Sequence, residues 1–134
     1  MSTTTVTTTN DVMRTKPDFK TVVAADTLKL EDNGKTILLG STSGAFTVTL
    51  PAVKNGLRFK FVVSTVSSAI RTISATTAVI QGTVVANGAS VAGVNETNIA
   101  LSASSKVGDT IELISDGTNF YLEGTAQGAT VTLS

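Results

Sequence analysis

The chain has 134 residues, a length that fits one domain with a single hydrophobic core. Ten basic and ten acidic residues give a formal net charge of zero, so no overall field attracts nucleic acid or anionic lipid. Cysteine and histidine are both absent, which excludes disulfides, thiolate metal sites, cysteine nucleophiles and the Ser-His-Asp triad. We therefore expect a protein that is not an enzyme and uses no cofactor.

Residues 1–23 are predicted to form an extended N-terminal arm. This segment is rich in threonine, then carries mixed charges and Pro17, and shows no sustained period of 2 or 3.6 residues. It lacks the basic and apolar regions of a signal peptide, and no later run approaches the roughly 20 apolar residues of a membrane span, so export by a signal peptide and membrane insertion are disfavoured. The segment is either a disordered tail without a role or an arm that becomes ordered on a neighbouring subunit; we favour the arm, because threonine and valine extend easily.

Residues 24–134 are predicted to form an all-β domain, an antiparallel β-sandwich or barrel. Hydrophobic residues make up 41% of the chain but aromatic residues only 4%, and the abundance of small and β-branched residues favours pleated sheets. Short alternating segments recur at intervals of about 8–12 residues, as in sandwiches and barrels. No segment has helical apolar spacing over three turns, so little helix is expected.

The first predicted strands, residues 27–30 and 35–40, should pair as a hairpin through the Asn33-Gly34 turn. Residues 46–50 alternate between apolar and polar side chains until Pro51 removes a backbone donor. Residues 57–63 form the strand that should anchor the core, because they include Phe59 and Phe61 on the inward face. Arg58 and Lys60 then face outward.

The second half of the chain contains further alternating segments, at residues 70–74, 78–86, 99–103 and 129–133. A bulge or bend is expected at Gln81-Gly82, and Asn87-Gly88 ends that strand. Residues 89–98 are rich in small side chains and leave their structure open. Residues 107–124 read as two strands joined by a Ser-Asp-Gly-Thr-Asn turn, with Phe120 facing inward and Tyr121 outward.

An interface is the predicted role of a set of basic and aromatic side chains: Arg14, Lys16, Phe19, Lys20, Arg58, Lys60 and Tyr121. The basic residues could form one contact surface, and Tyr121 is either exposed or buried between subunits. The alternative for the basic residues is a solvated face without a partner.

Carboxylates offer two other kinds of site. The turns at residues 31–34 and 115–119 have oxygen ligands for calcium, but they lack EF-hand spacing and consist of ordinary turn residues. A glycosidase pair would have to come from Asp109, Glu112, Asp116 and Glu123. Glu112 and Glu123 lie on outward faces, so we expect them to be in water rather than in a catalytic site.

Three elements resemble small β-domains of tailed-phage structural proteins, which include capsid decoration (cement) proteins and parts of tail fibres. The first comprises residues 25–28 and 32–39, the second residues 44–51 and 56–61, and the third the hairpin from Gly108-Asp109 to Phe120-Tyr121. In that family the position of Phe120 is often occupied by tryptophan, so this chain departs from the pattern there. The difference costs little in packing, because phenylalanine fills much the same role. The resemblance extends over about residues 24–124.

The resemblance implies a decoration protein that binds the mature capsid, commonly as a homotrimer, with the major capsid protein as its partner. Its location would be the capsid surface of a virion assembled in the host cytoplasm. The short chain without shaft repeats or a collagen-like stretch favours the head over the tail. The first alternative is a tail-fibre or receptor-binding β-domain that contacts a cell-surface glycan. The second is a hydrolase that uses two carboxyl groups about 5–10 Å apart.

Overall fold

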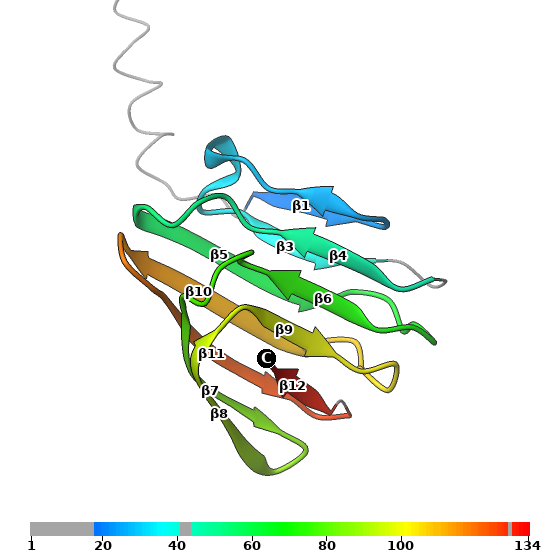
Figure 1. Ribbon diagram of the computed structural model, residues 1–134. Coiled ribbons are helices and arrows are strands. Elements are labelled where there is room, and N and C mark those ends of the chain that lie inside the picture. Colours follow the sequence, from blue (N-terminus) through cyan, green and yellow to red (C-terminus); the bar gives the residue numbers. More distant parts are fainter. Residues whose placement is uncertain (1–17, 41–43, 129) are drawn as a thin grey trace, which may run out of the picture.

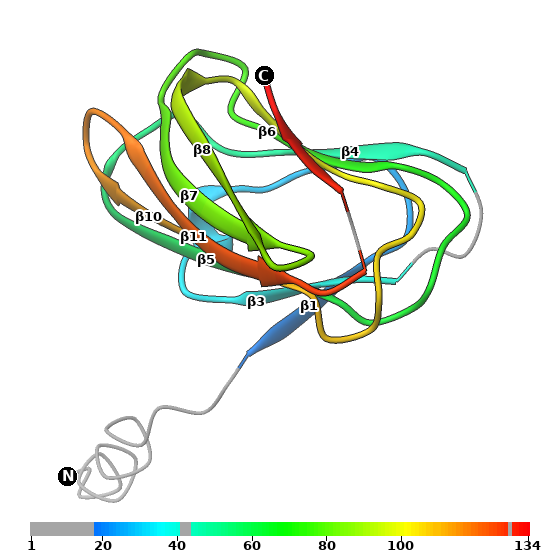
Figure 2. The ribbon, with the colours of Figure 1, turned by 90° about the horizontal axis from the view of Figure 1, so that it is seen from below.

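The computed structural model describes residues 18–40, 44–128 and 130–134, and within these ranges the chain forms two packed β-sheets (Figures 1 and 2). The predicted all-β sandwich is confirmed. The seven-stranded sheet contains, in spatial order, β1 (Phe19–Val22), β3 (Thr36–Leu39), β5 (Asn55–Val63), β10 (Thr110–Asp116), β11 (Phe120–Ala126), β7 (Ile80–Ala86) and β8 (Ala89–Glu96). The five-stranded sheet contains β12 (Val131–Leu133), β9 (Asn98–Leu101), β6 (Arg71–Ser74), β4 (Phe46–Thr49) and β2 (Asp26–Thr27).

From β1 to β7 the chain crosses from one sheet to the other at every connection. A chain that crosses to the opposite sheet and returns re-enters the first sheet in its original direction. The pairs β1/β3, β3/β5, β2/β4 and β4/β6 are therefore parallel, as is β11/β7. The predicted antiparallel arrangement holds for the remaining pairs, so both sheets are mixed.

The predicted hairpin through Asn33-Gly34 is wrong. β2 lies in the five-stranded sheet beside β4, whereas β3 lies in the seven-stranded sheet. The 3-10 turn η1 (Leu30–Asp32) occupies part of the predicted first strand. The Asn33 side chain accepts a hydrogen bond from the Arg58 N–H (2.8 Å) and donates one to the Gly56 carbonyl (3.1 Å), which fastens this turn to the start of β5. The Asn-Gly pair thus turns the chain between sheets rather than within one.

The folded domain begins before residue 24, the predicted boundary. All four residues of β1 pair with β3, and Lys20 and Val22 lie opposite the buried Ile37 and Leu39. Val22 is itself buried, so this end of the predicted arm is an edge strand of the sandwich. The mixed charges of the segment obscured its alternation. Residues 1–17, the rest of the predicted arm, lie outside the described residues.

Other predicted strands are confirmed with small shifts at their ends. The strand at residues 46–50 is β4, and the hairpin at residues 107–124 is β10 and β11, paired from Thr110 opposite Thr125 to Ser115 opposite Phe120. The register between β7 and β8 shifts between Ile80 and Gly82, where a bulge was expected. Residues 89–98, for which the sequence predicted no definite structure, form β8 and the start of β9.

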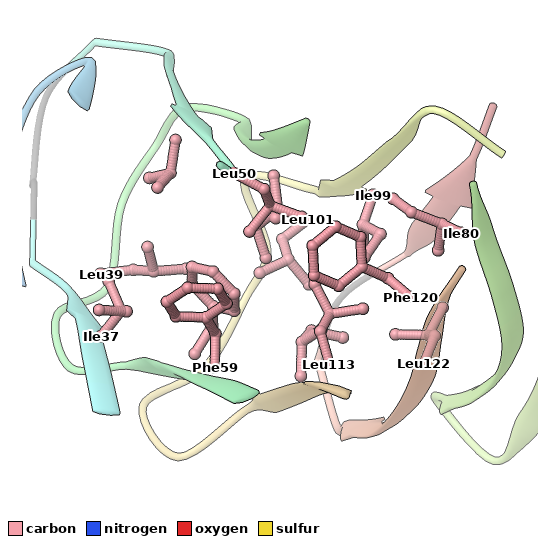
Figure 3. Close-up of a cluster of buried hydrophobic side chains, with 14 of the residues drawn as sticks. Ile37, Leu39, Leu50, Phe59, Ile80, Ile99, Leu101, Leu113, Phe120 and Leu122 are labelled. Atoms are coloured by element: carbon pink, nitrogen blue, oxygen red, sulfur yellow. The ribbon is translucent and has the colours of Figure 1, made fainter. Parts of the chain in front are cut away.

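The core lies between the sheets, and β5 is its central element (Figure 3). Phe59 and Phe61 are buried, as predicted, while Arg58 and Lys60 on the same strand are exposed. Phe120 and Leu113 from the seven-stranded sheet meet Ile99 and Leu101 from the five-stranded sheet (Figure 3). Burial of such side chains is the main term that stabilises a sandwich.

Arg71, at the start of β6, is also buried. Its guanidinium donates to the backbone carbonyls of Leu39 and Thr65, which belong to segments at one end of the sandwich. Burial lowers the pKa of this guanidinium from its ordinary value. We interpret Arg71 as a structural residue that ties the loops to the sheets, because backbone carbonyls satisfy part of its donor set.

Candidate functional site

The seven-stranded sheet has one side that packs on the core and one side that points away from it. The side chains that point away from the core form a continuous surface, which we call the outer face. Cross-strand pairing aligns these residues in rows. The middle row is Phe19, Thr36, Lys60, Glu112, Glu123, Thr83 and Ala92. One flanking row is Thr21, Leu38, Val62, Thr110, Thr125, Val85 and Ser90. The other is Arg58, Ile114, Tyr121 and Gln81.

Large hydrophobic side chains are exposed on this outer face. Phe19 is 57% exposed, Tyr121 47%, and Ile114 and Val85 43% each. The opposite surface of the molecule is different: in the described part of the chain, no strand of the five-stranded sheet contributes an exposed large hydrophobic residue. Other exposed large hydrophobic residues, among them Val23, Leu30, Val66, Ile70 and Val107, lie outside this face. Ile114 and Tyr121 are paired across β10 and β11 and form an apolar centre on the face, a feature of interaction surfaces.

Charges on the outer face are separated by sign. Arg58 and Lys60 lie on β5, whereas Glu112 and Glu123 lie on β10 and β11. The Arg58 guanidinium forms an ion pair with Glu112, with 2.7 Å between Nη2 and Oε1. Lys60 and Glu123 form no ion pair with any residue in the described ranges. One positive and one negative side chain of this face therefore remain available to a partner.

Tyr121 is held in place on the outer face by the turn before it. Its hydroxyl donates a hydrogen bond of 2.8 Å to Asp116 Oδ2, while Asp116 Oδ1 accepts the N–H groups of Thr118 (2.8 Å) and Asn119 (2.9 Å). The N–H groups of Asn119 and Thr118, followed by the Tyr121 hydroxyl, hold the pKa of the Asp116 carboxyl below its ordinary value. A ring fixed in this way loses little conformational entropy when it binds a partner.

Lys20 does not belong to the outer face. It lies opposite the buried Ile37 and points to the other side of β1, where its Nζ is 3.1 Å from Asp26 Oδ2 and 3.2 Å from Asp32 Oδ2. Lys35 reaches Asp32 Oδ1 at 3.2 Å, and the Lys29 N–H donates to Oδ2 at 2.9 Å. Burial opposes the charge of Lys20, but Asp26 and Asp32 outweigh it and hold its pKa above the ordinary value. This lysine thus fastens the edge of the sandwich.

The predicted interface residues are therefore divided. Phe19, Arg58, Lys60 and Tyr121 share the outer face, and Lys20 lies in the ionic cluster around Asp32. Arg14 and Lys16 lie outside the described residues. The predicted single basic surface is not formed by the described residues.

Replacing Asp32 with asparagine should destabilise the domain at neutral pH by about 1–3 kcal/mol, because a buried carboxylate with charged donors is lost. Burial raises the pKa of the Asp32 carboxyl, but the Lys29 N–H, Lys35 and Lys20 outweigh it, and the pKa lies below the ordinary value. The carboxylate stabilises the fold above the pKa of the unfolded chain, about 3.9, and this contribution disappears as the pH falls through the lower pKa of the folded state.

Urea unfolding from pH 7 to pH 3 measures this effect. The difference between wild type and Asp32→Asn should shrink below about pH 4. The matched control is Asp26→Asn, because Asp26 is more exposed and forms an ion pair with Lys20 alone. Equal effects of the two variants at every pH would contradict the assigned role of Asp32.

The carboxylates considered for calcium or catalysis have structural partners or lie in the open. Both oxygens of Asp32 and of Asp116 accept hydrogen bonds from the chain, and Asp109 accepts the N–H groups of Lys106 and Gln127. Glu112 and Glu123 face each other across neighbouring strands on the outer face. Across the described ranges, no three residues of the types His, Cys, Asp and Glu form a group able to hold a metal ion.

The same ranges contain no helix with the length and apolarity needed to cross a membrane.

Two residues of the outer face were missed in the sequence. Ile114 and Val85 are large and apolar, and such residues are ordinarily assigned to the core. The signal was present for Ile114, because it has the same parity in its strand as Thr110 and Glu112. Val85 lies in an apolar run whose faces cannot be told apart by alternation.

No protein-family model, curated protein or solved structure matches this chain.

Proposed function

We propose that this protein is a structural component of a tailed-phage virion, a decoration (cement) protein that binds the outer surface of the capsid shell and stabilises it. Its partner is the major capsid protein, and it assembles as a homotrimer on capsids formed in the host cytoplasm. Two things support this proposal: the resemblance carried by the three sequence elements, and the outer face. The outer face carries the argument, because it presents Phe19, Ile114 and Tyr121 to solvent on a rigid sheet.

The mechanism is preferential binding. A protein that binds the assembled shell but not its separated subunits stabilises the shell by mass action. A stable interface of this kind buries roughly 800 Å² on each partner, with aromatic and arginine side chains at its centre. The outer face includes Phe19, Tyr121 and Arg58, three residues of these types.

Cryo-electron microscopy of the parent particle tests the proposal. The expected result is density for many copies of this domain on the outside of the shell, at positions of local threefold symmetry. Shells from which the protein has been removed should break at lower temperature, and adding the purified protein should restore their resistance. Density confined to the tail would contradict the proposal and favour the tail-fibre alternative.

Deletion of the arm separates attachment from folding. Removing residues 2–17 should leave the thermal midpoint of the domain nearly unchanged and weaken its cosedimentation with shells. The matched control removes residues 2–22, which also deletes β1 and should lower the midpoint, because Val22 is buried and β3 loses its neighbour. A loss of stability in the shorter deletion as large as in the longer one would assign residues 2–17 to the fold.

A further inference from the structure

We infer that the outer face of the seven-stranded sheet is the surface through which copies of this chain associate, with β5 of one copy lying against β11 of another. The occupant of the face is thus a second copy of this chain. The inference concerns the free protein and does not depend on the capsid role. Because the proposed capsid contact uses the same face, a second copy and the shell would occupy it in turn.

Charge complementarity between copies carries the inference. β5 and β11 lie on either side of β10, and the unpaired Lys60 and Glu123 occupy the same row across the sheet. Consider two copies whose outer faces are turned toward each other, related by a two-fold axis that runs parallel to β10 between the two sheets. In this arrangement β5 of each copy lies over β11 of the other. Lys60 of one copy then faces Glu123 of the second at the same level, and the reciprocal pair forms as well. Lys60 and Glu123 thus become paired between two faces. Glu112, on β10 at the axis, lies near Glu112 of the other copy, and Arg58 of its own chain, 2.7 Å away, neutralises each carboxylate.

A second row makes the same match. Arg58 on β5 and Tyr121 on β11 share the row of Ile114. The same rotation places the Arg58 side chain of one copy over the exposed Tyr121 ring of another, the geometry in which a guanidinium is attracted to an aromatic face. Ile114 lies on β10, next to the axis, where its apolar side chain would meet a symmetry-related apolar group. Two rows of the face are therefore complementary to themselves.

The extent of the face is adequate for association. Six spacings between strands of about 4.8 Å and strands about seven residues long give it an area of roughly 700 Å². A standard interface buries roughly 800 Å² on each partner, so most of the face would be covered. The pairing is two-fold, so it joins two copies and uses the β5 side and the β11 side of each face together.

The alternative surface has none of these features. The outward residues of the five-stranded sheet include Thr47, Thr49, Thr72, Ala100 and Thr132, which are small and uncharged. A hydroxyl-rich face of this kind offers neither charge pairs nor large apolar anchors to a second copy. The outer face of the seven-stranded sheet is therefore the better candidate for self-association.

Analytical ultracentrifugation of the purified full-length chain tests the inference without any capsid. The wild type should sediment above the monomer mass. Lys60→Glu and Glu123→Lys should each weaken association by about tenfold or more, because each replaces an attractive pair with a repulsive one. The double variant, Lys60→Glu with Glu123→Lys, should recover most of the wild-type association. Matched controls are Lys54→Glu and Glu31→Lys, which reverse exposed charges outside this face and should leave the mass unchanged.

Circular dichroism of every variant establishes that the fold is retained. A wild type that stays monomeric at all concentrations would overturn the inference, and so would an oligomer that is indifferent to both single reversals. A double variant that remains as weak as the single variants would also overturn it, because the Lys60–Glu123 pair predicts rescue. Failure here leaves the capsid test unaffected, since a monomer can still be seen on the shell.

Discussion

Replacing Phe59 with alanine should lower the free energy of unfolding by about 3–5 kcal/mol. The ring of Phe59 is fully buried at the middle of β5, between the two sheets (Figure 3). Its removal takes apolar surface out of the core and leaves a cavity that buried residues such as Leu39 and Leu113, the latter paired with Phe59 across β5 and β10, fill only in part. Phe61, with the same orientation two residues further on, should show a similar loss.

Urea unfolding followed by circular dichroism measures this loss. The matched control is Lys54→Ala, because Lys54 is exposed, directly precedes β5 and lies outside the outer face. Its effect should stay within about 0.5 kcal/mol. If Phe59→Ala changed stability no more than Lys54→Ala does, the assigned register of β5 would be incorrect.

Replacing Gly82 with alanine should destabilise the protein by about 3 kcal/mol or more, from backbone strain and overlap together. Gly82 has φ +136°, a conformation that residues with a side chain rarely adopt. An added Cβ would also lie too close to the backbone of Leu122 on the neighbouring strand β11. Relief of that overlap requires β7 and β11 to separate at Gly82, which weakens the parallel pairing of these strands.

Gly88→Ala separates strain from overlap. Gly88 also has a positive φ, +79°, but an added Cβ meets no atom within 4 Å. Its replacement should cost only about 1–2 kcal/mol. Thermal unfolding of both variants under the same conditions provides the comparison. Equal costs would mean that β7 and β11 separate easily at Gly82 and are not closely packed there.

The outer face is supported by the packed core beneath it. The side chains that fill the core and those that form the face alternate along the same strands, so a strand that is firmly packed inside presents fixed groups outside. Ile111 and Leu113 are buried, and Glu112 and Ile114 between and beyond them point outward. A rigid surface binds a partner with a smaller loss of entropy than a mobile loop does.

The sequence by itself determined the properties that depend on neighbouring residues. The all-β character, the inward position of Phe59 and Phe61, and the opposite orientations of Phe120 and Tyr121 follow from alternation along one strand. The β10–β11 hairpin also followed, because its turn and its two strands are contiguous in the chain. Only residues within the same strand or turn had to be compared.

The tertiary structure alone decided which strands share a sheet. A turn such as Asn33-Gly34 satisfies the same backbone conformation whether the next strand pairs with the previous one or crosses to the opposite sheet, so local signals could not exclude the hairpin. The same is true of β1, whose partner β3 confers on it a buried side that its composition did not show. The outer face has the same origin: Phe19 and Lys60 join the row of the Glu112–Glu123 hairpin because long-range backbone pairing aligns β1, β3, β5 and β10. No pattern within one strand contains that alignment.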